Sequence, residues 1–253
     1  MKLANHVAII TGAGRGIGKQ TALVLAEAGA NIILAARSVP EIEAVADEIR
    51  ALGRKALAIP TDVTQKPQVE SMVKKTYDAF GKVDILINNA GLARHNLIPD
   101  IDEQDWDDQI AVNLKGTFLC TQAVFKQMCE QKYGNIINIS STYGIIAPDQ
   151  RIYGTSGQNS SAFYASTKSA LINLTRYLAS YWNRKGIRVN TFSPGGVENN
   201  QDPKFIKKYS EKTMIGRMAK KDEYIGAVIF LCSDASSYMT GSNLIIDGGW
   251  TAW

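Results

Sequence analysis

Short apolar runs alternate along this chain with longer segments in which apolar residues recur at helical spacing. The runs are continuously apolar rather than alternating, which is typical of strands covered on both faces of a parallel sheet. They predict strands at Val7–Ile10, Asn31–Ala36, Lys55–Pro60, Val83–Ile87, Asn135–Ile139, Ile187–Phe192 and Asn243–Ile246. Helical spacing predicts helices over Gly16–Ala28, Pro40–Leu52, Pro67–Phe80 and Glu103–Gln131, another ending near Lys185, and two shorter ones before the last strand.

This alternation predicts an α/β fold of the Rossmann type. Successive strands joined by helices form right-handed crossovers, so we expect a doubly wound, seven-stranded parallel sheet with helices on both faces. The chain has no Pro/Ser-rich linker, no shift in composition and no internal repeat. A single domain over residues 1–253 is therefore predicted.

Composition narrows the class of protein. The 253 residues are 45% hydrophobic and 21% charged, with a net charge of +4 spread along the chain. Nucleic-acid binding would require a dense basic patch, and a membrane span a long apolar run, and neither is present in the sequence. The first residues show no apolar core followed by a small-residue cleavage site, so no signal peptide is expected, and three cysteines without metal-ligand spacing fit a reducing compartment. We therefore expect a cytoplasmic protein with no metal, membrane or nucleic-acid partner.

A glycine-rich turn follows the first predicted strand, at Thr11-Gly-Ala-Gly-Arg-Gly-Ile-Gly18. Glycines let the backbone turn tightly and approach a pyrophosphate, which binds at the positive end of the next helix. The spacing of Gly12, Gly16 and Gly18 differs from the common dinucleotide fingerprint, and a tight connection is the structural alternative. Its position between a strand and a helix favours phosphate binding.

The end of the second predicted strand favours NADP(H) over NAD(H). An acidic residue there would bind the ribose hydroxyls of NAD, but the chain has Ala36 followed by Arg37. Arg37, with Arg15 from the glycine turn, suits a 2′-phosphate. Both arginines could instead be ordinary surface residues, which leaves NAD(H) as the alternative.

Tyr164 and Lys168 are four residues apart, so they share one helix face. An adjacent ammonium favours the phenolate, and we expect Lys168 to lower the pKa of Tyr164 toward neutrality. Such a phenol could donate or accept a proton near neutral pH. The pair alone also occurs by chance on solvated helix faces.

Taken together, these motifs resemble the short-chain dehydrogenase/reductase family over nearly the whole chain. The resemblance rests on the glycine turn, Asp62, Asn88-Asn-Ala-Gly91, Asn113, Ser140-Ser141, Tyr164-x-x-x-Lys168, Pro194-Gly195 and Asp247-Gly-Gly249. Within the family the chain looks most like 3-oxoacyl-carrier-protein reductases and related sugar and polyol dehydrogenases.

The resemblance implies a catalytic tetrad. Tyr164 would donate the proton, Lys168 would assist it and hold the nicotinamide ribose, Ser141 would bind the substrate oxygen, and Asn113 would hold a water. Ser140 is the alternative to Ser141, and Asn113 could simply interrupt a helix. The implied cofactor contacts are Gly12, Arg15, Gly16, Ile17, Arg37, Asp62, Val63, Asn89, Tyr164, Lys168 and Val197. Asp62 could instead cap the helix that follows it.

Two segments depart from the family pattern. The interval from Ser141 to Tyr164 is longer by ten residues, and the excess lies near Pro148–Asn159, within a predicted insertion at 144–162. We expect this insertion to border the active site, with a tolerated surface loop as the alternative. Asn199 stands where relatives often have Thr, in a lid expected near residues 196–218.

The predicted function is an NADPH-dependent carbonyl reductase or alcohol dehydrogenase acting on a small-molecule carbonyl or alcohol. An NAD(P)-linked sugar or polyol dehydrogenase is the alternative within the same chemistry, and a non-catalytic nucleotide-binding module is the alternative outside it. Members of this family commonly assemble through their two long helices and last strand. This resemblance implies that the chain forms a homo-oligomer, either a tetramer or a dimer. The apolar tail Gly249–Trp253 is expected to dock on a neighbour or on the chain itself.

Overall fold

A computed structural model describes residues 3–95, 97–156 and 158–253 and contains one parallel sheet of seven strands. The strand order is β3-β2-β1-β4-β5-β6-β7, so the chain winds outward from β1 in both directions. The strands are β1 Val7–Thr11, β2 Asn31–Ala36, β3 Ala56–Pro60, β4 Ile85–Asn88, β5 Gly134–Ile139, β6 Ile187–Pro194 and β7 Asn243–Ile246. The predicted fold class is confirmed, and every predicted strand is present.

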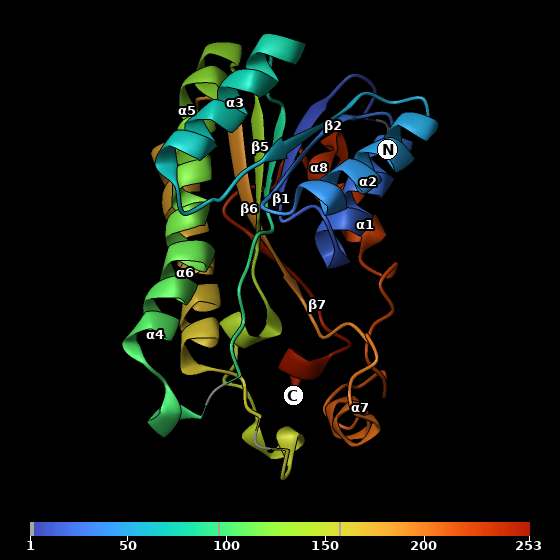
Figure 1. Cartoon of the computed structure of the whole chain (residues 1–253), viewed down its shortest axis with the longest axis vertical. Coiled ribbons are helices and arrows are strands. Elements are labelled where there is room, and N and C mark those ends of the chain that lie inside the picture. Colours follow the sequence, from blue (N-terminus) through green and yellow to red (C-terminus); the bar gives the residue numbers. More distant parts are fainter. Residues whose placement is uncertain (1–2, 96, 157) are drawn as a thin grey trace.

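Helices cover both faces of the sheet (Figure 1). On one face, α1 Gly16–Glu27, α2 Val39–Ala51 and α8 Ile225–Cys232 pack with the strands in a core that includes Leu25, Ile42 and Leu231. On the other face, α3 Lys66–Phe80, α5 Gly116–Gln131 and α6 Ala162–Tyr181 form a second core around residues such as Met72 and Val124. The continuous apolar strands are explained by this double coverage.

Two helices differ from the sequence prediction. Residues 103–131 form a continuous helical segment, but α4 Glu103–Ile110 joins α5 through a π-helical turn at Ala111–Lys115. Helix α6 ends at Tyr181, not near Lys185. Arg184 and Gly186 have φ of 61° and 76°, and this left-handed backbone cannot continue a right-handed helix.

Four segments gather beyond the carboxyl ends of the strands (Figure 1). They are α4, a 3₁₀ turn at Gln150–Tyr153, α7 Pro203–Ser210, and the last residues of the chain. Ligands of open parallel sheets bind at this edge, where the strand order reverses. None of the helices in the described ranges is both long and apolar enough to cross a membrane.

A buried polar ladder ties the centre of the sheet to α5 and α6. Asn88 Nδ2 donates to Asn138 Oδ1 at 2.9 Å and to Thr121 Oγ1 at 3.1 Å. Asn138 Nδ2 in turn donates to Thr175 Oγ1 at 2.9 Å, and Thr191 Oγ1 donates to the same oxygen at 2.7 Å. Buried amides and hydroxyls are costly unless paired, so the ladder fixes how α5 and α6 sit on the strands.

Replacing Asn138 with Ala should therefore destabilise the protein by roughly 2–4 kcal/mol, because Asn88 and Thr175 would both lose a buried partner. Denaturant unfolding measures this change. Asn173→Ala, at an exposed position of the same helix α6, is the matched control and should change stability by less than about 0.5 kcal/mol. Equal effects of the two substitutions would contradict the role given to the ladder.

Candidate active site

The glycine turn forms an open cradle at the start of α1. Gly12 and Gly16 have φ of 65° and 56°, which side-chain-bearing residues rarely adopt. A β-carbon on Gly18 would lie 2.3 Å from the carbonyl oxygen of Gly12, so only glycine permits this close approach. A β-carbon on Gly16 would meet no described atom within 4 Å, which leaves room for a ligand beside the backbone.

The amides at the start of α1 are available to an anion. Arg15, at the N-cap, makes no capping hydrogen bond through its side chain, and the first turn contains no acidic residue. Partial positive charge at a helix start favours a phosphate. The cradle, its glycines and this charge together fit the pyrophosphate of a dinucleotide.

Asn89 holds the glycine turn against β4. Its Nδ2 donates to the carbonyl oxygens of Thr11 and Gly12 at 2.9 and 3.1 Å, while its backbone amide donates to Thr11 Oγ1 at 3.0 Å. The Nδ2 of Asn89 therefore shapes the turn, and its Oδ1 makes no described hydrogen bond.

The remaining predicted nucleotide contacts lie along the same sheet edge. Arg15 and Arg37 are exposed, and neither forms an ion pair with another described residue. Asp62 Oδ1 accepts from the backbone and hydroxyl of Thr64 at 2.9 and 2.8 Å, a local turn before α3. Val63 is buried against Gly116. Arg15 and Arg37 are thus accessible to a ligand at this edge of the sheet, and Val63 packs directly behind it.

On the far side of that edge, Ile17 is partly buried at the start of α1. Val197 makes a parallel bridge with Ala219, and its carbonyl oxygen accepts from Gln201 Nε2 at 2.8 Å. Asn199 is exposed, and its amide donates to Gln201 Oε1 at 2.6 Å. The side chain of Asn199 has no described hydrogen bond.

Tyr164 and Lys168 lie together on α6, below the end of β5. The Lys168 ammonium lies 5.6 Å from the centre of the Tyr164 ring and donates to the carbonyl oxygen of Ile139 at 2.7 Å. Lys168 is only 4% exposed. Burial lowers its pKa from 10.5 to about 8, because a buried ammonium loses its hydration.

The predicted lowering of the Tyr164 pKa by Lys168 is wrong for this structure. Burial is the largest influence and raises the Tyr164 pKa, while a hydrogen bond with Ser141 lowers it by a smaller amount. The ammonium lies over the ring face and is directed to Ile139, so it does not pair with the phenol oxygen. Tyr164 is held as a protonated phenol, which is the form that donates a proton.

The two adjacent serines have different environments. Ser140 is buried, and its hydroxyl donates to the backbone carbonyl of Lys168 at 2.7 Å. Ser141 is partly exposed, accepts from the amide of Tyr143 at 3.2 Å, and lies close enough to Tyr164 to lower the pKa of that phenol. Ser140 thus fastens β5 to α6, and Ser141 is the serine placed beside the phenol.

Asn113 occupies the π-helical turn between α4 and α5 and is 1% exposed. Its Oδ1 accepts from the amide of Leu92 at 2.7 Å, and its Nδ2 donates to the Leu92 carbonyl and to Thr167 Oγ1 at 2.9 and 3.1 Å. These bonds join the loop after β4 to α6. A β-carbon on Gly91 would lie 3.7 Å from both Asn113 Oδ1 and the Lys168 ammonium, so the two lie close together.

Three aromatic residues that the motifs did not single out also gather here. Tyr143 packs edge-on against Trp250, with ring centres 5.9 Å apart, and Tyr209 packs against the same Trp250 at 4.3 Å. The Tyr209 hydroxyl accepts from the amide of Gly196 at 2.5 Å. Proximity in sequence to Ser141 could have indicated Tyr143, but no local pattern indicates Tyr209. Trp250 docks on the chain itself, whereas Trp253 is exposed.

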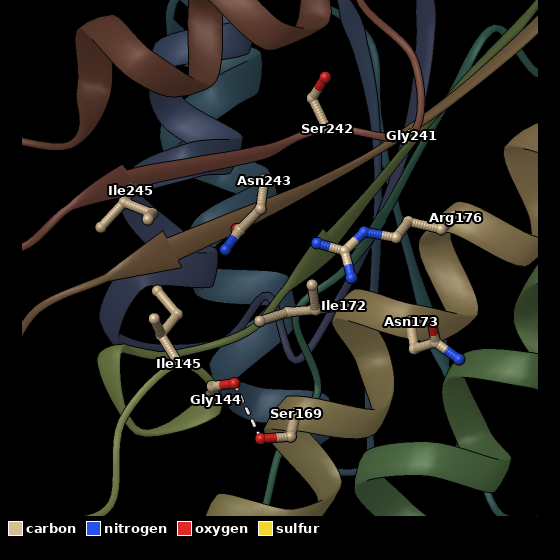
Figure 2. A pocket seen from close by; sticks show the side chains of 10 residues that line it. All are labelled: Gly144, Ile145, Ser169, Ile172, Asn173, Arg176, Gly241, Ser242, Asn243 and Ile245. Atoms are coloured by element: carbon tan, nitrogen blue, oxygen red, sulfur yellow. Dashed lines mark hydrogen bonds between the residues drawn. The ribbon is translucent and has the colours of Figure 1, made fainter. Parts of the chain in front are cut away.

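A separate groove of about 630 Å³ runs between α6 and β7 (Figure 2). Ser169, Ile172 and Arg176 line it from α6, and Asn243 and Ile245 line it from β7. Ser169 and Arg176 are displaced by about a quarter turn around α6 from Lys168, whereas Ile172 lies one turn beyond Lys168 on the same face. Neither Tyr164 nor Lys168 lines this groove, so it is not the place where the predicted catalytic residues meet. The described residues contain no group of His, Cys, Asp or Glu suited to a metal.

Comparisons with known proteins agree with this geometry. A family model described as enoyl-(acyl carrier protein) reductase matches residues 12–251. The chain is 39% identical to (2S)-[(R)-hydroxy(phenyl)methyl]succinyl-CoA dehydrogenase subunit BbsD of Thauera aromatica, with 98% of each chain covered. It is 38% identical to 3-oxoacyl-[acyl-carrier-protein] reductase FabG of Thermotoga maritima, covering 98% of this chain and 99% of that one.

A solved structure shares the fold closely. A gluconate 5-dehydrogenase from Burkholderia cenocepacia in complex with NADP and tartrate superposes with a TM-score of 0.91 at 35% identity, covering 100% of this chain and 97% of that one. A family model spanning nearly all of the chain and relatives of this identity are sufficient to assign the family. The chain belongs to the short-chain dehydrogenase/reductase family of oxidoreductases, which bind a nicotinamide cofactor.

Proposed function

We propose that this protein is an NADP(H)-dependent carbonyl reductase and alcohol dehydrogenase in which Tyr164 donates the proton to the carbonyl oxygen. The observation that carries the proposal is the Lys168 ammonium over the Tyr164 ring, with Ser141 beside the phenol and the open glycine turn on the same sheet edge. Gly12, Gly16 and Ile17 would hold the pyrophosphate end, and Arg15 and Arg37 the 2′-phosphate. Asp62, Val63, Asn89 and Val197 would line the rest of the nucleotide site.

The bound nicotinamide supplies the hydride in reduction and accepts it in oxidation. As the carbonyl carbon gains a hydride, negative charge develops on its oxygen. Ser141 donates a hydrogen bond to that oxygen, and Tyr164 transfers its phenolic proton there, so a secondary alcohol forms. In the reverse direction the Tyr164 phenolate accepts the alcohol proton.

Lys168 and Asn113 would assist the proton transfer. A phenolate formed at Tyr164 is an anion in a buried site, and the nearby Lys168 ammonium offsets its charge. The side-chain amide of Asn113 is fully engaged by Leu92 and Thr167. A water that relays the proton to solvent would therefore bind the backbone carbonyl of Asn113, which also accepts from Thr117 Oγ1 at 3.0 Å.

Two substrate classes fit the comparisons. The FabG relative suggests a 3-oxoacyl thioester, and the gluconate 5-dehydrogenase suggests a sugar acid or polyol. A non-catalytic nucleotide-binding module would have no need of Tyr164 and Lys168, whereas this chain keeps both, with the Lys168 ammonium over the Tyr164 ring and Ser141 beside the phenol. NADPH oxidation with a panel of acetoacetyl thioesters, diketones and keto sugars tests the proposal, and turnover of none of them would overturn it.

We also propose that the protein is a homo-oligomer. Phe118 on α5 and Tyr177 and Tyr181 on α6 are exposed, and the two tyrosine rings stack with centres 6.0 Å apart. Large exposed aromatic residues on neighbouring helices are typical of an interface between subunits. Light scattering on the purified protein gives the number of subunits directly.

Tyr164→Phe should lower kcat by roughly 10²–10⁴-fold, because it removes the proton donor and almost no volume. Binding of NADPH, followed by its fluorescence, should change by less than about twofold. Tyr238→Phe removes the same hydroxyl from a fully exposed position and is the matched control. Near-normal turnover in the Tyr164 variant would remove this residue from the proton-transfer step.

Arg37→Ala should weaken NADPH binding by roughly 10-fold or more, through loss of a charge-assisted contact, and leave NADH binding nearly unchanged. Fluorescence titration with both cofactors measures the two dissociation constants. Arg176→Ala, in the groove between α6 and β7, controls for the loss of one positive charge. Tighter binding of NADH than NADPH by the unaltered protein would show that the preference for NADP(H) is incorrect.

Lys168 should make the stability of the protein depend on pH. Its pKa is about 8 when folded and 10.5 when unfolded, so between these values the unfolded chain binds more protons. Stability relative to Lys168→Met should therefore rise with pH across this interval, by up to about 3 kcal/mol. Denaturant unfolding of both proteins from pH 7 to 10.5 tests this, and parallel curves would contradict a buried, depressed Lys168.

A further inference from the structure

Part of the insertion between Ser141 and Tyr164 packs against other segments of the chain. Its 3₁₀ turn Gln150–Tyr153 lies beside α7, and Ile152 is 2% exposed in a small apolar cluster with Tyr209, Met218 and Trp250. The members of this cluster come from the insertion, from the lid region and from the end of the chain. Burial of Ile152 there stabilises the docked position of all three segments.

Polar contacts fasten the same two segments together. Asp149 pairs with the Lys212 ammonium at 2.6 Å and with Arg151 at 2.7 Å. The Lys208 ammonium donates to the carbonyl oxygen of Arg151 at 3.2 Å. Hydrogen bonds from Arg151 and then Lys212 hold the pKa of Asp149 well below its usual range, so this carboxylate is charged at neutral pH. Lys208 lies in the last turn of α7, and Lys212 lies just after the helix. The insertion therefore binds the lid through charged contacts as well as apolar ones.

The insertion also reaches the catalytic residues. Tyr143 and Tyr153 pack against the same apolar cluster, and each phenol influences the pKa of the other. Tyr143 follows Ser141 by two residues and donates its amide to the Ser141 hydroxyl. Tyr153 lies near enough to Tyr164 to raise the pKa of that phenol. Its ring contacts Phe205 of α7, with centres 5.4 Å apart.

We infer that Tyr153 is a substrate-positioning residue and that the Asp149–Lys212 ion pair clamps the lid, so that this site selects small, hydroxylated carbonyl compounds over long acyl chains. The inference rests on the proposed carbonyl chemistry and deepens it. The phenols of Tyr153 and Tyr143 lie beside the proton donor Tyr164 and offer hydrogen bonds to substrate hydroxyl groups.

The free-energy cost of leaving polar groups unpaired favours a polar substrate at this site. An acyl chain packed against the Tyr153 hydroxyl would displace water without replacing its hydrogen bonds, which leaves polar groups unpaired. A long chain would also need α7 to move aside, and this movement would separate Asp149 from Lys212 and expose Ile152. A hydroxylated substrate pairs with the phenols and fits beneath a lid that stays in place.

Tyr153→Phe tests the positioning role through two substrates of equal length. With a polyhydroxylated keto acid, kcat/KM should fall roughly 10-fold or more, mainly through a higher KM. With the hydroxyl-free keto acid of the same length, it should change by less than about twofold. Tyr238→Phe is the control, because Tyr238 is fully exposed and does not belong to the apolar cluster around Ile152. Equal changes with both substrates, or no change with either, would overturn the inference.

Asp149→Asn tests the clamp. Hydrogen exchange of amides 203–210 should accelerate several-fold, and activity on long 3-oxoacyl thioesters should rise relative to acetoacetyl thioester. Asp78→Asn removes an exposed ion pair with Lys74 on α3 and is the matched control. Unchanged exchange together with an unchanged chain-length profile would overturn the clamp.

The wild-type protein separates the two levels of the argument. Failure of the unaltered protein to oxidise NADPH with any carbonyl compound would overturn the proposed function itself. Normal turnover, with Tyr153→Phe and Asp149→Asn behaving like their controls, would overturn only the role of the insertion.

Discussion

The position of helix α6 on the sheet is the constraint on which the candidate site depends. Three polar contacts along one stripe of the helix set it: the Lys168 ammonium on Ile139, the Ser140 hydroxyl on the Lys168 carbonyl, and Thr175 on Asn138. All three partners belong to the last residues of β5 or follow it directly. Apolar packing alone tolerates sliding of a helix, whereas buried hydrogen bonds are satisfied in one register. Ser141 is therefore brought beside Tyr164 by the same contacts that seat the helix.

The site is built at some cost to stability. Burying the Lys168 ammonium lowers its pKa to about 8, which means that the folded protein holds this charge less readily than the unfolded chain does. The π-helical turn at Ala111–Lys115 likewise departs from regular helix geometry, and it is the turn that presents Asn113 to Leu92 and Thr167. A buried ammonium and a π-helical turn are both uncommon in folded proteins, and such exceptions concentrate at functional sites.

The sequence predicts most of the architecture because the dominant signals are local. All seven strands lie within a few residues of their predicted bounds, since continuous apolar runs report burial on both faces. The motif residues also meet as expected, because strand ends of a parallel sheet share one edge. The Tyr164 pKa was predicted in the wrong direction, since helical spacing gives proximity to Lys168 but neither the depth of burial nor the direction of the ammonium.

Contacts between residues far apart in the chain could not be predicted from the sequence, because no local pattern indicates them. Nothing local to Tyr209 indicates that its hydroxyl accepts from Gly196, and nothing local to Ile152 indicates that Trp250 covers it. The insertion was expected at the rim of the site, but its grip on α7 depends on a carboxylate and an ammonium 63 residues apart, Asp149 and Lys212. Such pairs form only when the fold brings distant segments together, so no short stretch of sequence indicates them.

A lid that is already docked changes how binding energy is used. A mobile lid must be ordered when substrate binds, and the loss of conformational freedom offsets part of the affinity. Here the apolar cluster around Ile152 and the Asp149–Lys212 pair hold α7 in place through contacts within the chain. Less substrate affinity is then consumed in closure, but a bulky substrate must break these contacts before it enters. Preorganisation and restricted substrate size are thus two consequences of the same contacts.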